Sequence, residues 1–352
     1  MAEQTIRSSF ERQAGACSDL GSPFTAALCR LMAERLDRAT AFGRRILDWP
    51  GPPGADALPL RAAGALHALA RRGYEPLARL YPPAPFPGPD ALWEGVRHAL
   101  ASHDRELAAF LDSPPQTNEV ARSGVLIGGF LVLARETQAP LDVLEIGASA
   151  GLNMGFDRYA YELGQAGSHA SAAAGEDAPV RLACDWRGLR PPPLDAPLRV
   201  RSRAACDQNP LDPADPAARE RLLAYVWPDQ AQRLARLEAA LDAAAAAPWR
   251  VEKADAADWV ERRLAEPREP GGCRTLYHSI VWQYLPPAVQ ARIQNAMEAA
   301  GAAASSGEPL AWLRLEADGD PRSAGLRLTL WPGGETRLLA RGDFHGRWAE
   351  WL

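Results

Sequence analysis

The stretch that decides the fold is Val143-Leu144-Glu145-Ile146-Gly147-Ala148-Ser149-Ala150-Gly151-Leu152-Asn153. It begins with a short β-rich run at 141–146, and five small residues then lead into a helix that we expect to open near Leu152. Small side chains let the backbone approach a ligand closely, and N–H groups at the start of a helix are donors. The stretch therefore predicts a strand, a ligand-binding turn and a helix.

Strand and helix patterns alternate after this stretch. A helix at 119–137 precedes it, and the later strand candidates are 198–204, 249–252, 275–281, 310–316, 326–331 and 336–341. Helical patterns lie between the earlier ones, at 217–225, 230–247, 256–265 and 287–300. This alternation predicts a parallel sheet. Only the Pro-Gly-Gly segment 332–335 separates the last two strands, which predicts an antiparallel hairpin.

The first ~115 residues show helical patterns and no alternating strand. Ser22 followed by Pro23 predicts the start of a helix, and Asp90 predicts the cap of a long helix that runs through Leu111. We therefore expect a helical N-terminal subdomain at 1–117 and an α/β domain at 118–352. The segment 164–197 is rich in Gly, Ala and Pro, which indicates an insertion in the α/β domain.

The composition is that of a soluble globular protein, with 47% hydrophobic and 24% charged residues and a net charge of −5. Without a basic stripe, we expect no nucleic-acid partner. The longest apolar run, 124–134, is too short to cross a bilayer, and residues 1–13 lack the apolar core of a signal peptide. Five scattered cysteines favour reduced thiols in a cytoplasmic protein. No histidine pair has metal-ligand spacing, so we predict no metal site. The oligomeric state stays open.

The loop after the first strand resembles motif I of S-adenosylmethionine-dependent methyltransferases, with Ser149 in place of the middle glycine. The resemblance implies S-adenosylmethionine as cofactor, S-adenosylhomocysteine as its product, and the fold of class I methyltransferases. That fold is an α/β, Rossmann-like sheet of seven strands, mostly parallel, with an antiparallel hairpin at its C-terminal end. The residues that would bind the cofactor in this loop are Glu145, Gly147, Ser149, Gly151 and Asn153.

Two downstream segments extend the resemblance. In nucleotide-binding α/β folds the next strand ends in a carboxylate for the ribose hydroxyls, and Asp207 with Asn209 has that form, although it lies far beyond the ~20 residues expected. The insertion at 164–197 would account for the distance. Asp255 and Ala256, after the third strand candidate, resemble the adenine-edge motif of the same enzymes.

The segment 277–286 ends the fourth strand, where methyltransferases place substrate-side residues. His278 or Tyr284 would act as base or orienting group for a small-molecule acceptor. The other residues expected on the acceptor side are Gln116, Asn118, Glu119, Gln283 and His345.

Four segments together resemble an uncharacterised bacterial family, domain of unknown function 2332. They are 114–119, the loop motif, 278–286 and 328–334, so the resemblance spans nearly the whole chain. It implies no established activity.

Two alternatives to the methyltransferase stay open. Gly147-Ala148-Ser149-Ala150-Gly151 also satisfies the G-x-S-x-G elbow of serine hydrolases, with Asp255 or Asp320 and His278 or His345 as formal partners. The helices before it and the lack of an upstream oxyanion loop weigh against that interpretation. The other is a noncatalytic or regulatory protein that keeps the fold, which Ser149 and the displaced Asp207 make credible. A nicotinamide site is disfavoured, because G-x-G-x-x-G fails at Ser149.

Overall fold

The computed structural model describes residues 2–116, 118–164 and 178–352, which form two compact units. Unit 1 consists of Met1–Thr117 and Pro216–Glu238, and unit 2 of Asn118–Asp215 and Ala239–Leu352. Unit 1 therefore includes a segment, 216–238, that the sequence analysis placed in the α/β domain. The boundary at 238/239 falls inside one helix, α9 (Ala231–Ala245).

Unit 1 is helical, and none of its described residues forms a strand. Its core contains Phe10, Phe42 and Leu66, which are fully buried. The helices besides α9 are α1 (Ala2–Asp19), α2 (Pro23–Arg35), α3 (Ala41–Leu47), α4 (Leu58–Arg71), α5 (Glu75–Ala78), α6 (Pro89–Phe110) and α8 (Pro216–Ala224).

Helix α2 begins at Pro23, as the sequence predicts, but the side chain of Ser22 does not cap it. The cap comes from Asp229 instead. Its carboxylate accepts a hydrogen bond from the Phe24 N–H at 2.9 Å and another from the Ser22 hydroxyl. Segment 216–238 thus supplies a stabilising contact to a helix more than two hundred residues earlier in the chain.

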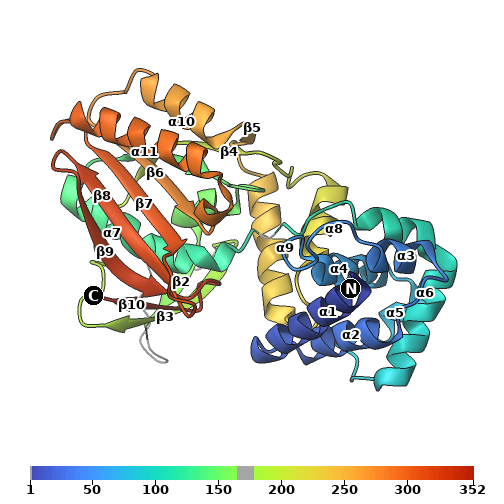
Figure 1. Cartoon of the computed structure of the whole chain (residues 1–352). Coiled ribbons are helices and arrows are strands. Elements are labelled where there is room, and N and C mark those ends of the chain that lie inside the picture. Colours follow the sequence, from blue (N-terminus) through green and yellow to red (C-terminus); the bar gives the residue numbers. More distant parts are fainter. Residues whose placement is uncertain (1, 117, 165–177) are drawn as a thin grey trace. The chain divides into compact units, whose positions relative to one another are not determined.

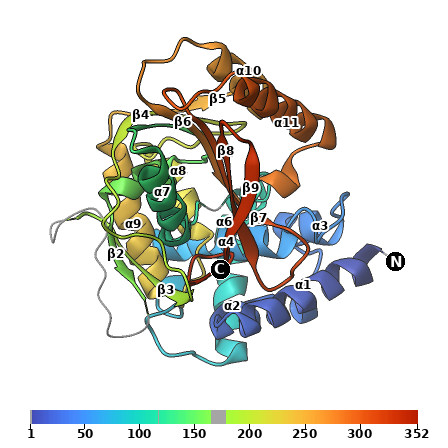
Figure 2. The same cartoon turned by 90° about the vertical axis from the view of Figure 1, so that its left-hand side faces the viewer.

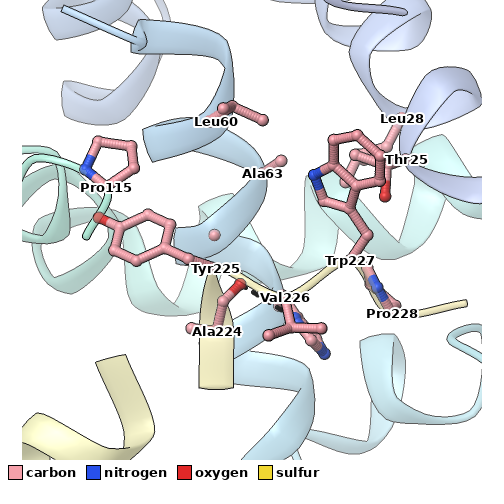
Figure 3. Close-up of a pocket in the computed structure, with 12 residues that line it drawn as sticks. Thr25, Leu28, Leu60, Ala63, Pro115, Ala224, Tyr225, Val226, Trp227 and Pro228 are labelled. Carbon is pink, nitrogen blue, oxygen red and sulfur yellow. Dashed lines mark hydrogen bonds between the residues drawn. The ribbon is translucent and has the colours of Figure 1, made fainter. Parts of the chain in front are cut away.

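A small cavity lies in unit 1, between α2, α4 and the segment 224–228 (Figure 3). Its volume is about 40 Å³. A water molecule needs about 10–15 Å³ of such space, so the cavity suits a few waters rather than a substrate. His67 lines it and hydrogen-bonds through Nδ1 to the Ala224 carbonyl at 3.0 Å. Burial lowers the pKa of His67 to about 4, which makes it a neutral core residue.

Unit 2 contains one sheet of ten strands in the order β2-β3-β10-β9-β8-β7-β6-β1-β4-β5. Strands β1, β4, β5, β6 and β7 run parallel, whereas β8 is antiparallel to both of its neighbours. The bounds are β1 (Leu141–Ile146), β2 (Ala160–Leu163), β3 (Arg181–Gly188), β4 (Val200–Asp207), β5 (Val251–Lys253), β6 (Cys273–Ser279), β7 (Leu310–Ala317), β8 (Ala324–Trp331), β9 (Glu335–Gly342) and β10 (Trp348–Trp351).

The prediction of a mostly parallel α/β sheet is confirmed, and so is the hairpin of β8 and β9. The strand count of seven is wrong, because β10, β3 and β2 extend the sheet beyond β9. Strand β3 lies in the segment expected to be an insertion. Its buried residues Leu182, Cys184 and Trp186 alternate with more exposed ones, and the Gly- and Pro-rich flanks hide that period of two. Residues 165–177 of the same segment lie outside the described residues.

Helices cover both faces of the sheet (Figures 1 and 2). Helix α7 (Ser123–Thr137) packs on one face, and α10 (Ala256–Ala265) and α11 (Pro287–Ala302) pack on the other. Successive side chains of β1 point to opposite faces of the sheet. Leu144 and Ile146 join the core under α10 and α11, whereas Glu145 points to the α7 side and meets Tyr277 there.

The α-helix expected near Leu152 is a 3-10 segment instead, η2 (Leu152–Arg158), which leads directly into β2. Packing explains the difference, since residues 152–156 are all buried. Two tyrosine hydroxyls also donate to its carbonyls, Tyr159 to Leu152 and Tyr161 to Phe156. No helix among the described residues is long and apolar enough to cross a membrane.

Candidate functional site

The strand order of unit 2 reverses between β1 and β6. β4 and β5 lie on one side of β1, and β6 and β7, which come later in the chain, lie on the other, all parallel. Between β1 and β4 the chain forms β2 and β3 at the far edge of the sheet. In open α/β sheets ligands bind outside the carboxyl ends of the strands at such a reversal. The loops after β1, β4 and β6 meet at this edge, which makes it the candidate site.

The loop after β1 has an unusual backbone. Gly147, Ser149 and Gly151 have φ angles of 66°, 55° and 72°. A Cβ on Gly147 would lie 2.3 Å from Cγ2 of Val281, so this glycine also allows the loop after β6 to pack against it. Ser149 has no such freedom, and a serine in the left-handed region stores strain. Strain of this kind is common at functional sites.

The loop uses much of its hydrogen-bonding capacity within the protein. The Ser149 N–H donates to Oδ2 of Asp207 at 2.8 Å, and the Leu152 N–H donates to Oδ1 of Asn118 at 3.0 Å. The Ala148 N–H donates to the Cys206 carbonyl. By contrast, the buried hydroxyl of Ser149 has no partner among the described residues. A ligand atom at this edge would give that hydroxyl the partner it lacks.

Asp207, at the end of β4, braces the site. Its Oδ2 accepts from Ser149 and its Oδ1 accepts from the Asn209 N–H at 2.8 Å. A carboxylate offers about four acceptor positions, so each oxygen keeps capacity for one more donor. Asp207 is half-buried and Asn209 is exposed, so both are accessible to a ligand.

Asp255, which the sequence suggested as an adenine contact, caps a helix in the structure. It is the N-cap of α10, and its Oδ1 accepts from the N–H groups of Ala257 and Asp258 at 2.9 and 3.2 Å. Ala256 is the first residue of that helix. Capping alone accounts for an aspartate here.

Glu145 is buried beneath the loop. Tyr277, its neighbour across the sheet, donates its hydroxyl to Oε2 of Glu145 at 2.8 Å. Burial raises the pKa of Glu145 to about 8, although the Tyr277 hydrogen bond opposes that rise. The side chain is therefore an uncharged acid near neutral pH.

His278, predicted as a base, faces the opposite side of the sheet from Glu145 and is fully buried. Its Nδ1 hydrogen-bonds to Oε1 of Glu316 at 2.6 Å, and its Nε2 accepts from the Trp312 indole at 3.1 Å. Both ring nitrogens are thus in use, and the Trp312 bond fixes the proton on Nδ1. This arrangement leaves no nitrogen for a substrate.

Glu316 is the residue that the sequence analysis missed. It lies near the end of β7 and is buried. Besides His278 it accepts from the backbone N–H groups of Val281 and Trp282, at 3.2 Å each. It therefore holds the loop after β6 in position. The available signal was a carboxylate near the end of a mostly apolar strand, two residues after Arg314.

The residues expected on the acceptor side divide into separate groups. Two of them, Asn118 and Glu119, are buried under the loop with Asn153, a residue predicted to bind the cofactor. Asn153 accepts from the Ser123 hydroxyl at 2.7 Å and donates to the Glu119 carbonyl. These three position the loop.

The other predicted acceptor-side residues lie apart from that network. Gln283 and Tyr284 are exposed on the short 3-10 segment η3 (Trp282–Tyr284), with Tyr284 73% exposed. His345 is half-buried in the turn after β9, and Gln116 belongs to unit 1. Within the described part of the chain no group of three His, Cys, Asp or Glu could hold a metal ion.

The chain belongs to an uncharacterised family of proteins conserved in bacteria, domain of unknown function 2332, whose family model matches residues 7–351. No curated protein and no solved structure gives a significant match.

Proposed function

We propose that unit 2 binds S-adenosylmethionine at the carboxyl edge beside β1 and catalyses methyl transfer to a small-molecule acceptor. One observation carries the proposal: the reversal of strand order between β1 and β6 coincides with the strained loop 147–151 and with a carboxylate at the end of the neighbouring strand β4. Nucleotide ligands in open α/β sheets use this combination.

The residues present fit such a cofactor in two respects. Asp207 keeps acceptor capacity for ribose hydroxyls, and the buried Ser149 hydroxyl lacks a partner among the described residues. When bound, the cofactor supplies an activated methyl group. The protein's part is then to hold the acceptor in line and exclude water, so proximity accounts for much of the rate. With His278 enclosed, Tyr284 is the remaining predicted group that can orient an acceptor.

A noncatalytic protein with the same fold is the second candidate. Both oxygens of Asp207 already brace the loop, and the 3-10 segment η2 stands where an α-helix would offer N–H groups to a ligand. The geometry gives less support to a serine hydrolase. The Ser149 hydroxyl makes no hydrogen bond to a base among the described residues, which nucleophilic catalysis requires.

Calorimetry with S-adenosylhomocysteine tests the proposal. We expect binding at micromolar levels or tighter. Asp207→Ala loses charge-assisted bonds worth roughly 1.5–3 kcal/mol, about 10- to 150-fold in affinity. Asp212→Ala, an exposed carboxylate in the same loop, is the matched control and keeps wild-type affinity.

Substitutions that remove or replace the Ser149 hydroxyl distinguish the methyltransferase from the serine hydrolase. Ser149→Ala preserves S-adenosylhomocysteine binding and Ser149→Leu abolishes it, because the larger side chain would enter the site. Absence of heat at millimolar ligand would contradict cofactor binding. Binding without turnover of any acceptor favours the noncatalytic protein. A covalent phosphonate adduct on Ser149 that is lost in Ser149→Ala would establish the hydrolase.

A further inference from the structure

A pocket of about 200 Å³ lies in unit 2, beside the strained loop and on its β5 side. Ala150 contributes from the loop after β1, and Pro210 and Leu211 from the loop after β4. Ala244 of α9, with Trp249 and Val251 at the entry to β5, completes its mostly apolar wall. Pockets for drug-sized ligands measure about 300–1,000 Å³, so this one suits a single ring system.

Trp249 gives this wall a polar group without a partner. Its indole nitrogen Nε1 is buried and has no acceptor among the residues that the structure describes. Buried donors are nearly always satisfied, so an exception calls for an explanation. The neighbouring ring atom Cδ1 lies 3.9 Å from where a Cβ on Gly151 would stand, so the N–H edge faces the loop side of the ring.

Arginines surround the indole. The guanidinium carbons of Arg158 and Arg203 lie 4.7 and 5.0 Å from its ring centre, within the range of a cation–π contact. Arg203 is neutralised by Asp157, but Arg158 has no carboxylate partner in the described chain. Arg250, which lines the pocket, donates only to the carbonyls of Ala247 and Trp249.

The pocket has fewer carboxylates than arginines around it. Among the described residues, Asp212 is the one carboxylate that lines the pocket; it is exposed, and its Oδ1 accepts from the Ala214 N–H. Arg250 lines the pocket, whereas Arg158 lies over the Trp249 ring and does not line it. Together these two guanidinium groups outweigh the one solvated carboxylate, so the charge in and beside this ring-sized space is positive. That balance favours an anionic ligand over a cationic one.

We propose that this pocket binds a small aromatic carboxylate, whose ring packs against the apolar wall and whose carboxylate accepts the Trp249 N–H near Arg158 and Arg250. The ligand would satisfy the orphan donor and the unpaired charge at once. The inference does not depend on the proposed function, because the pocket is too small for S-adenosylmethionine and lies on one side of the loop.

Benzoate is the probe. With protein whose tryptophans carry ¹⁵N in the indole, we expect the Trp249 N–H resonance to shift saturably with a Kd below about 1 mM, while the other indole signals stay in place. Loss of one signal in Trp249→Phe assigns it. Trp249→Phe keeps a ring and removes the donor, so benzoate affinity falls at least about tenfold, as expected when a hydrogen bond to a charged group is lost. Ala244→Leu, which fills the pocket, abolishes binding in a protein whose melting curve shows it to be folded.

The matched control is Trp348→Phe. Trp348 is also half-buried and also carries a guanidinium, Arg187, over its ring at 5.4 Å, but it lies on β10 and not in the pocket. Its substitution leaves benzoate binding unchanged. Arg158→Gln weakens benzoate and spares benzamide, the uncharged analogue.

Three outcomes overturn the inference. The first is that the Trp249 signal does not shift at a benzoate concentration 50 times the expected Kd of about 1 mM. Another is equal affinity for benzoate and benzamide in the wild type, which would remove the role of charge. The third is loss of S-adenosylhomocysteine binding in Trp249→Phe, which would make the pocket part of the cofactor site. Failure of S-adenosylhomocysteine to bind the wild type leaves the benzoate result standing.

Discussion

At the scale of single residues, Glu145 links the protonation of the site to the stability of unit 2. Its pKa rises from an ordinary 4.5 to about 8 on folding, chiefly because it is buried. Below pH 4.5 the carboxyl is protonated in both states. Between pH 4.5 and 8 the unfolded chain releases its proton and the folded chain does not, so the free energy of unfolding falls as the pH rises, by up to about 1.4 kcal/mol per pH unit.

Glu145→Gln removes this titration and keeps an oxygen for the Tyr277 hydroxyl. We expect the variant to match the wild type at pH 4 and to exceed its stability at pH 8, measured by urea unfolding at both values. Glu162→Gln, at an exposed position of β2, is the control and leaves the pH dependence intact. Parallel pH profiles for wild type and Glu145→Gln would show that Glu145 is charged in the folded state.

His278 gives a second prediction at this scale. His278→Leu makes neither hydrogen bond, so the buried Trp312 indole loses its acceptor and Glu316 keeps only the N–H groups of Val281 and Trp282. We expect unit 2 to lose roughly 1.5–3 kcal/mol of stability in urea unfolding. Gln283→Ala, exposed five residues later, changes it by less than about 0.5 kcal/mol. A variant of wild-type stability that has lost activity would instead establish His278 as a base.

At the scale of elements, the turn after β6 is a second strained part of the site, besides the loop after β1. Ile280 has a φ of 50°, a conformation in which a β-branched residue is an outlier. Such strain costs about 1–3 kcal/mol. Ile280→Asn, which tolerates the left-handed region, should raise the melting temperature of unit 2.

Val281→Asn is the matched comparison, because Val281 has a negative φ of −124° and packs against the Gly147 position. It should lower the melting temperature. A decrease in both variants would mean that the packing of Ile280 outweighs its backbone strain.

The sequence predicts some elements well and others poorly, for physical reasons. β1 and the loop after it combine a strong strand pattern with glycines at φ angles that only glycine adopts easily, so both are readable locally. β3 pairs with β10, about 160 residues later in the chain, which no local pattern reports. η2 is held by hydrogen bonds from the hydroxyls of Tyr159 and Tyr161, and hydrophobic periodicity does not report such side-chain contacts. The enclosure of His278 depends on Glu316 and Trp312 of another strand, and no spacing in the sequence reports that contact.

At the scale of the whole molecule, unit 1 is discontinuous in sequence. Segment 216–238 supplies Asp229 to the start of α2, the Ala224 carbonyl to His67, and the Tyr225 hydroxyl to the Ser113 carbonyl. A fragment of residues 1–117 should therefore melt at a lower temperature than unit 1 does in the full chain.

A synthetic peptide of residues 216–238 should bind that fragment and raise its melting temperature, measured by circular dichroism. The same peptide with Asp229→Ala should do so more weakly, since it loses a helix cap worth about 1 kcal/mol. Equal melting curves with and without the wild-type peptide would contradict a structural role for the segment in unit 1.

The position of β10 near the end of the chain determines when β2 and β3 can join the sheet during translation. β2 and β3 emerge early, but β10, the strand that joins them to the rest of the sheet, follows about 160 residues later. At a synthesis rate of about 5–20 residues per second, the edge of β3 that pairs with β10 stays open in the nascent chain for roughly 10–30 s. An open edge invites pairing with other chains, so the interval before residue 348 is made is when this protein most needs chaperones.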